Sequence, residues 1–223
     1  MLLSTAATPR KNNKQIVLHT ANTVNFRGAV TADSVTAIQL KIDRQAKRLH
    51  RSKPLYLVIN SPGGSIDAGE QLIEFLKGYP NVKVVCIFCA SMAHAILQAV
   101  NNERLVLASS TLMAHRARLS GIGGQIESGE LESRLIMIKK IVRSMEIRNA
   151  KRIGISLKKY KARVINEWWV VGKDIIHLNH ADRIVEIKCT TGLIQSKEST
   201  TVRSLFGSRT VKTSKCPLIN GQL

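Results

Sequence analysis

The stretch PLYLVINSPGGSIDAGEQLIEFLKGY, residues 54–79, decides the fold of this chain. Its first part, residues 54–60, is a compact apolar run of the kind that forms a strand buried on both faces of a sheet. A turn with two adjacent glycines follows, and residues 70–79 then have the pattern of a helix. A buried strand that leads through a turn into a helix is one part of a parallel crossover unit.

The same alternation continues on both sides of this stretch. Upstream, residues 15–26 are β-branched and partly alternating, which indicates strand structure. Apolar side chains over residues 34–49 recur every three or four positions, which predicts a helix. Downstream, residues 82–90 predict a buried strand and 91–100 a short apolar helix. Further strands are expected at residues 104–109, 111–119 and 181–189. The sequence therefore predicts an α/β fold, with a largely parallel sheet and helices on both faces.

The ends of the chain differ from its middle. Residues 1–14 are small and polar, and we expect an N-terminal arm there. A glycine-rich joint at 121–125 precedes the longest predicted helix, from about Glu127 to Ile153. After Thr190 the composition turns to Ser, Thr, Lys and Gly, so residues 191–223 are expected to be a basic C-terminal tail. The folded domain is then 15–190.

The charge of the chain is unusual. Lys and Arg number 34 against 15 Asp and Glu, a formal net charge of +19. This balance favours a polyanionic or acidic partner, such as nucleic acid or acidic protein. The alternative is a well-solvated surface. Aromatic residues make up 4% of the chain, which is too few for a base-stacking surface.

Composition also bears on the compartment. No run of ~18 apolar residues occurs, so we expect no membrane-spanning helix. The first residues lack the apolar core of a signal peptide, which favours a cytoplasmic protein. Four cysteines in a chain of this size do not resemble a disulfide framework, and we expect reduced thiols.

Two turns between a strand and a helix are candidates for chemistry. In Asn60–Ser65, Gly63 and Gly64 lack β-carbons, so their N–H groups can face an anion or a developing oxyanion near a helix start. Ser91 lies where a second buried strand meets a helix, at the sheet edge that carries active sites in open α/β folds. The alternatives are a plain tight turn and a helix-capping serine.

His115 is the candidate base. It ends the strand-like segment TLMAH, and an imidazole can take a proton from a serine near neutral pH. A purely structural histidine is the alternative. His94 competes, but three residues after Ser91 on a helix its ring is expected to point into packing. Cys86 and Cys89 have metal-ligand spacing, yet they lie within a predicted buried strand and no second such pair exists. We therefore expect no metal and no cofactor.

These three motifs, in this order, resemble the Clp protease proteolytic-subunit family of serine peptidases. NSPGGS resembles the family's glycine turn, CASMA its nucleophile segment and TLMAH its histidine strand. GIGGQ and the long helix are similar to its inter-ring handle, and residues 168–185 to its closing segment. The resemblance spans about residues 15–188 and is nearest to members encoded by phages and prophages.

The resemblance implies a crotonase-like ClpP fold, a ββα spiral with a long handle helix. It also implies a homo-oligomer built of rings, often two heptamers face to face. Carried over residue by residue, Ser91 is the nucleophile and His115 the general base, while N–H groups of the glycine turn at Gly63 and Gly64 and of Met92 hold the oxyanion. No cofactor is required.

Three departures from the family pattern qualify the expected mechanism. Counting back from Trp169 places Arg163 where the family has its third catalytic residue, an aspartate. Glu167 and Asn166 are the nearest substitutes, and we favour Glu167 because a carboxylate stabilises the imidazolium. Residues after His115 are Arg-Ala, where Gln-Pro is usual. The N-terminal arm does not resemble the family's axial loop, which argues against an ATP-driven unfoldase as partner.

The sequence thus predicts a serine endopeptidase of the ATP-dependent Clp type that acts on protein or peptide substrates, with phage capsid or scaffold protein as the natural class. The alternative is a catalytically silent crotonase-like ring protein with a structural or nucleic-acid-binding role. The missing aspartate and the charge of +19 favour the alternative, whereas Ser91, His115 and the glycine turn favour the peptidase.

Overall fold

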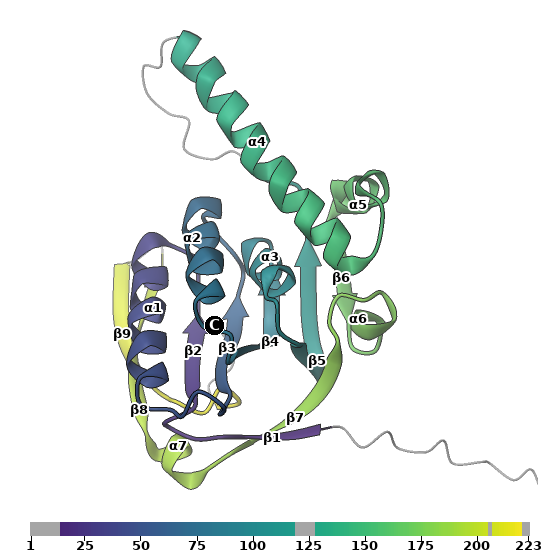
Figure 1. Cartoon of the computed structure of the whole chain (residues 1–223). Helices are drawn as coiled ribbons and strands as arrows, with labels where there is room; N and C mark the ends of the chain where they lie inside the picture. The colour runs from purple at the N-terminus through teal and green to yellow at the C-terminus, as the bar shows by residue number, and fades with distance from the viewer. Residues whose placement is uncertain (1–13, 119–127, 205–206, 220–223) are drawn as a thin grey trace, which may run out of the picture.

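A seven-stranded sheet organises the chain in this computed structural model, which describes residues 14–118, 128–204 and 207–219 (Figure 1). The strand order is β1-β7-β5-β4-β3-β2, and β6 pairs with β5 off this path. Every pair is parallel except β5 with β6, which confirms the expected largely parallel sheet. The strands are β1 (Lys14–Leu18), β2 (Thr23–Arg27), β3 (Leu55–Ser61), β4 (Val82–Ala90), β5 (Arg104–Ala114), β6 (Trp168–Val171) and β7 (Arg183–Cys189).

Three helices cover one face of the sheet, as Figure 1 shows: α1 (Ala32–Ala46), α2 (Ile66–Lys77) and α3 (Met92–Ala99). They follow β2, β3 and β4 in turn, as crossover connections require. The Thr31 hydroxyl caps α1 by accepting from the N–H of Ser34, and Ser65 caps α2 in the same way. Their inward side chains and the apolar strand residues form one continuous core.

The second face of the sheet is covered differently from the expectation of helices on both faces. A second core joins Tyr56 and Val58 of β3 to Ile16 of β1, Val185 of β7 and Leu193 of α7 (Thr191–Gln195). Strands thus contribute to this second core, because β1 and β7, which pair with each other, supply Ile16 and Val185. No helix in the described part of the chain is long and apolar enough to cross a membrane.

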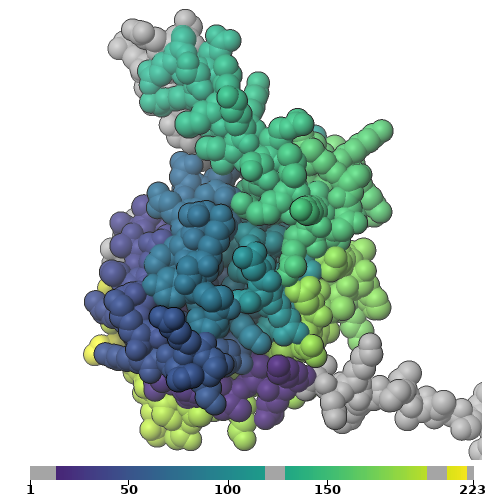
Figure 2. All heavy atoms as spheres, in the orientation of Figure 1, coloured from purple at the N-terminus to yellow at the C-terminus, as the bar shows by residue number. Residues whose placement is uncertain are grey.

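The long helix α4 (Ser128–Ile153) matches the helix predicted from the sequence. Its C-terminal half packs on the body through Met145, Asn149 and Ala150. Its N-terminal half projects away from the body, as Figures 1 and 2 show. The glycine-rich joint predicted before it, 121–125, lies outside the described residues. Short elements follow: α5 (Leu157–Arg163), η1 (Val164–Asn166) and α6 (Asp174–His177).

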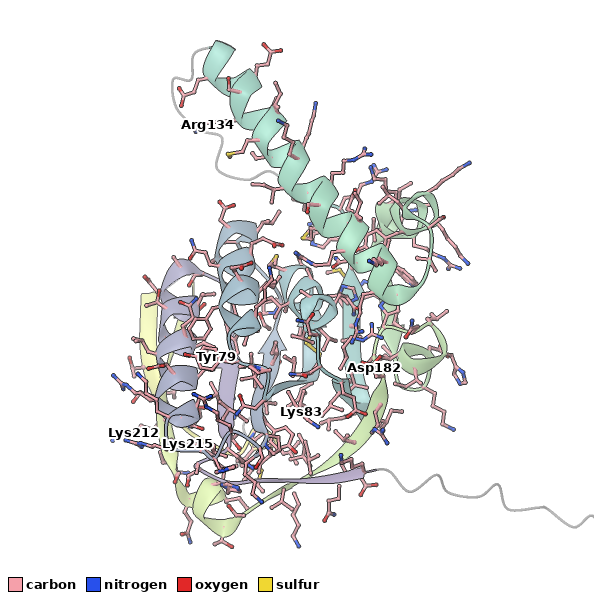
Figure 3. The ribbon with its side chains drawn as sticks, in the orientation of Figure 1. Tyr79, Lys83, Arg134, Asp182, Lys212 and Lys215 are labelled. Carbon is pink, nitrogen blue, oxygen red and sulfur yellow. A yellow bond between two sulfur atoms is a disulfide. The ribbon has the colours of Figure 1, made fainter. Side chains whose placement is uncertain are left out.

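Residues 191–219 are not the simple tail that composition suggested. After α7, strands β8 (Lys197–Ser204) and β9 (Gly207–Ser214) pair as an antiparallel hairpin, which lies beside α1 in Figure 1. Asn25 of β2 donates to the Glu198 carboxylate (2.9 Å) and to the carbonyl of Lys215 (2.7 Å). The Asn25 side chain thus anchors β8 and the residue that follows β9, which local composition could not reveal. Figure 3 labels Lys212 in β9 and Lys215 directly after it.

The expectation of reduced thiols was wrong. Cys86 is bonded to Cys89 within β4, and Cys189 at the end of β7 is bonded to Cys216 after the hairpin. A register shift between Cys86 and Phe88 breaks the regular alternation of β4, and both of its cysteines are fully buried. The second disulfide closes the hairpin segment onto the sheet. The Cys189–Cys216 pairing depends on a tertiary contact between segments 27 residues apart, whereas the Cys86–Cys89 pairing is local to β4.

A buried polar network fixes α3 to the chain after α6. The Arg104 side chain, 1% exposed, donates to Asp182 (2.6 Å) and to Gln98 of α3 (2.6 Å). Figure 3 labels Asp182 near the lower end of β5. The rings of His94 and His180 meet at 3.0 Å between nitrogens. Because α3 begins directly after Ser91, this network also sets the position of that residue.

The buried histidine pair makes the folded state sensitive to acid. Burial lowers the pKa of His180 to about 4, with the charge of Arg104 adding to the effect. The unfolded chain binds this proton near pH ~6.5. The His180 contribution is therefore fully present above that pH and is lost as pH falls towards 4. We expect urea unfolding to report a loss of about 3 kcal/mol over this range.

The matched control is His177→Asn, since His177 is exposed on α6. This variant should show the same pH dependence as the unmodified chain. His180→Asn should have a flatter dependence over this range. An equally steep dependence in His180→Asn would contradict the assignment.

Candidate active site

Ser91 occupies a strained turn between β4 and α3. Its backbone angles are φ 55° and ψ −120°, a region that non-glycine residues rarely adopt. Its N–H donates to the carbonyl of Met113 on β5 (2.8 Å). The side chain makes no capping hydrogen bond to α3, although a helix cap is the common use of a serine at this position. The hydroxyl is therefore held at the helix start and left available to another partner.

That partner is His115. The Nε2 atom of His115 lies 2.7 Å from the Ser91 Oγ. β4 and β5 run parallel with Ala90 opposite Met113, so each strand delivers its residue to the same sheet edge. The structure thus brings together two residues that the sequence assigned from separate motifs. A serine hydroxyl hydrogen-bonded to an imidazole is the arrangement that proton transfer to the ring requires.

The glycine turn packs directly against this pair. A β-carbon on Gly63, whose φ is 93°, would lie 2.7 Å from the Ser91 Cβ and 2.8 Å from the Met92 nitrogen. Any side chain at residue 63 would therefore collide with the turn that carries Ser91. A β-carbon on Gly64 would collide with the Val30 carbonyl. Glycine at both positions allows the backbone of this turn to lie close to the Ser91 turn and to Val30.

The N–H groups of the turn are not equivalent. The Gly63 N–H donates to the Ser61 hydroxyl (3.1 Å), and Gly63 is buried. Gly64 is exposed, and neither its N–H nor that of Met92 has an acceptor among the described residues. Met92 is the first residue of α3, where N–H groups have no partner within the helix. The site therefore offers two unused donors near Ser91, from Gly64 and Met92.

The environment of His115 favours the neutral form of its ring. Partial burial lowers the pKa of His115, the positive charge of Arg118 lowers it further, and the charge of Glu167 acts in the opposite direction. Neutral imidazole is the form that can accept a proton. Arg118, three residues after His115, was not singled out from the sequence.

Glu167 lies near His115 without bonding to it. Its carboxylate accepts from the Arg118 guanidinium (3.0 Å) and from the Trp169 indole N–H (3.1 Å). Within the described residues, the second ring nitrogen of His115 has no hydrogen-bond partner. Arg163 instead stacks over the Trp168 ring, 5.6 Å from its centroid, and the Asn166 side chain is exposed. Of the groups considered from the sequence, Glu167 is the one whose charge acts on His115.

The described residues support neither His94 as a competing base nor Cys86 and Cys89 as metal ligands. His94 is 1% exposed and contacts His180 and Gln98. This agrees with the expectation that the His94 ring points into the packed interior. Cys86 and Cys89 are joined in a disulfide and offer no thiolate. The described residues contain no group of three or more side chains suited to hold a metal ion.

A pocket opens beside the Ser91–His115 pair. The empty space between its walls is about 330 Å³, a volume that includes open solvent at its mouth. Helix α4 supplies part of its wall through Met145 and Asn149, and α5 supplies Tyr160. Met145 and Asn149 are four residues apart, so the helical period that places them on one face was a usable sequence signal. That they face the pocket depends on how α4 packs.

Comparison with known proteins identifies a family. The model of the Clp protease family matches residues 11–188. An ATP-dependent Clp protease proteolytic subunit of Borrelia garinii subsp. bavariensis is 29% identical over 160 residues, which cover 69% of this chain and 77% of the relative. Proteolytic subunit 2 of Prochlorococcus marinus strain MIT 9312 is 27% identical over 159 residues, 69% of this chain and 74% of the relative. The family match ends before the β8–β9 hairpin.

The two charges beside His115 can be tested through its titration. Removing the negative charge with Glu167→Gln should lower the pKa of His115, and removing the positive charge with Arg118→Gln should raise it. Nuclear magnetic resonance of the imidazole carbon–hydrogen groups measures both changes. Arg183→Gln is the control, because it removes a surface arginine that pairs with Glu103 on another part of the sheet. Shifts of the same sign in both site variants would contradict the electrostatic account.

Proposed function

Because this chain belongs to the Clp protease family, a family of peptidases, we propose that it hydrolyses internal peptide bonds of proteins by serine acyl-transfer chemistry. The observation that carries the proposal is the 2.7 Å hydrogen bond between the Ser91 hydroxyl and the His115 ring at the mouth of a pocket. Each step of such a reaction can be assigned to a group of this chain.

In the first step, the Ser91 Oγ attacks the carbonyl carbon of the scissile bond while its proton passes to the His115 Nε2. The carbonyl oxygen becomes an oxyanion. His115 then gives the proton to the leaving nitrogen, the carbon–nitrogen bond breaks and an ester on Ser91 remains. Water, deprotonated by His115, attacks that ester, and the acid product leaves as Ser91 regains its proton.

The oxyanion is proposed to accept from the N–H groups of Gly64 and Met92. Both donors are unused within the described residues, and Gly64 is exposed to an incoming peptide. Gly63, which the resemblance also suggested, has its N–H engaged by Ser61. Its role in this proposal is to permit the close approach of the two turns. Such preorganised donors typically contribute about 3 kcal/mol each to the transition state.

Glu167 is proposed to stabilise the protonated His115 through its charge. The imidazole becomes positive during attack, and a nearby carboxylate favours that state. Because Glu167 is bonded to Arg118 and Trp169, the proposed effect is electrostatic and does not require a direct hydrogen bond. The site then works as a Ser91–His115 dyad with a supporting carboxylate.

The substrate and assembly are part of the same proposal. The net charge of +19 favours acidic protein substrates, the class that includes phage scaffold and capsid proteins. Short peptides should be cleaved without nucleotide, since no step of the chemistry uses it.

The projecting half of α4 carries exposed apolar side chains, Ile136 (48%) and Met137 (51%), which favours a ring-joining handle.

Ser91→Ala should abolish hydrolysis of fluorogenic peptides, a loss of at least about a thousandfold, because no other group can form the ester. The fold should persist, since the Ser91 side chain caps no helix. Glu167→Gln keeps nucleophile and base and should slow turnover about tenfold. Ser133→Ala, an exposed serine on α4, is the control for a serine replaced elsewhere. Unchanged hydrolysis by Ser91→Ala would refute the proposal, and an inactive unmodified chain would favour the silent ring protein.

The handle proposal predicts an oligomer at micromolar concentration and moderate salt. Sedimentation velocity should show species several times the chain mass. Replacing Ile136 and Met137 together by Gln should dissociate rings from one another because their apolar contact is lost. Leu218→Gln is the control, as it removes an exposed apolar side chain near the hairpin. A monomer for the unmodified chain would exclude the assembly.

A further inference from the structure

The pocket beside Ser91 has an apolar wall and a polar end. The residues of its apolar wall come from helices α2, α3 and α4 and from strand β5 or its continuation, and they are Ile66, Met92, Ala95, Ala114, Ala117 and Met145. Ser91 and His115 line the same pocket. A substrate residue whose carbonyl lies at Ser91 therefore has this pocket within reach of its side chain.

Asn149 and Tyr160 supply the polar end. Both are almost fully buried, at 1% and 3% exposure. The Asn149 amide donates through Nδ2 to the Tyr160 hydroxyl (3.2 Å). The Asn149 Oδ1 is buried and has no hydrogen-bond partner in the described part of the chain. The Tyr160 hydroxyl accepts this one bond and donates to no described group, which leaves its proton unused.

Unpaired groups of this kind are uncommon. Buried polar atoms in native proteins nearly always have a partner, and those that lack one call for an explanation. Here one acceptor, Asn149 Oδ1, and one donor, the Tyr160 O–H, are adjacent and line the same pocket. A ligand that brings one donor and one acceptor side by side would satisfy both.

A primary carboxamide has that chemistry, because its NH₂ group donates and its carbonyl accepts. Rotating the Asn149 amide by half a turn exchanges its donor and acceptor, and the pair remains complementary to a carboxamide in the opposite orientation. In the first orientation a carboxylate would place an acceptor against Asn149 Oδ1, and in either orientation it would bury a negative charge without a counter-charge. A purely apolar side chain would leave both groups unpaired.

A cationic side chain is also disfavoured at this end of the pocket. The carboxylates on the neighbouring turns of α4 and α2 already have cationic partners. Glu146 pairs with Lys161 (3.3 Å), and Glu70 makes two bonds to Arg148 (2.6 and 2.8 Å). An ammonium or guanidinium group in the pocket would thus be buried without a free counter-charge.

We propose that Asn149 and Tyr160 make this pocket selective for a side chain that ends in a primary carboxamide, glutamine or asparagine, on the residue whose carbonyl Ser91 attacks. This inference rests on the proposed peptidase function and names its substrate class. Asn149 and Tyr160 are specificity-determining residues that bind the side chain and take no part in bond breaking.

The test compares four fluorogenic peptides that differ only at this residue: glutamine, asparagine, methionine and glutamate. Methionine matches glutamine in length without its hydrogen bonds. The chain should cleave the better of the two carboxamide peptides at least about tenfold faster, in kcat/KM, than the methionine or glutamate peptide. Whether glutamine or asparagine is preferred reports the depth of the pocket.

Two variants assign the selectivity. Asn149→Leu should reduce cleavage of the carboxamide peptides and raise that of the methionine peptide, so that the preference disappears. Tyr160→Phe removes one hydroxyl and should weaken the preference several-fold, and it serves as the test if Asn149→Leu does not fold. Asn101→Leu, an exposed asparagine after α3, should leave the ratio unchanged.

A binding measurement tests the selectivity of the pocket independently of the proposed peptidase activity. The Ser91→Ala chain should bind the labelled carboxamide peptide several-fold more tightly than the methionine peptide, as measured by fluorescence anisotropy. If the unmodified chain cleaves nothing but this binding preference is present and is lost in Tyr160→Phe, the pocket assignment stands and the peptidase fails. If binding and cleavage both lack a carboxamide preference, the pocket assignment is overturned.

Discussion

The pairing of β4 with β5 is the constraint on which the rest of the site depends. It sets Ala90 opposite Met113, so that Ser91 and His115 leave their strands side by side and meet at 2.7 Å. The same pairing lets the Ser91 N–H bond to β5, which holds the serine at a positive φ. A slip of one residue would turn His115 to the other face and separate the pair. The bond of the buried Arg104 to Asp182 and the buried His94–His180 contact then fix α3 behind this junction.

Local patterns in the sequence predicted the sheet and singled out Ser91 and His115 as candidates, and the family resemblance then suggested their roles. Continuous apolar runs mark β3 and β4 as buried strands, and each ends in a turn whose small residues tolerate close backbone contact. In a parallel sheet, turns at the carboxyl ends of the strands lie at the same edge. The sequence alone therefore indicated that Ser91 and the glycine turn lie at one edge of the sheet. The helical period likewise predicted α4 almost to its ends.

What the sequence could not supply depends on contacts between distant segments. The disulfides required knowledge of where β4 shifts register and where the chain after β9 returns to β7. The hairpin that replaced the expected tail is anchored by Asn25, which lies 173 residues from Glu198. The family resemblance suggested Glu167 as the residue that supports His115 but gave no sign of its bond to Arg118. The polar end of the pocket arises only where α4 and α5 pack together.

Covalent labelling with a fluorophosphonate, followed by tandem mass spectrometry, tests the central claim most directly. The reagent reacts with a serine whose proton a neighbouring base removes and whose adduct oxygen an oxyanion site can hold. The account predicts one phosphonyl group per chain, located on Ser91, and its loss in His115→Asn. Labelling of another serine, or no labelling of the folded chain, would contradict it.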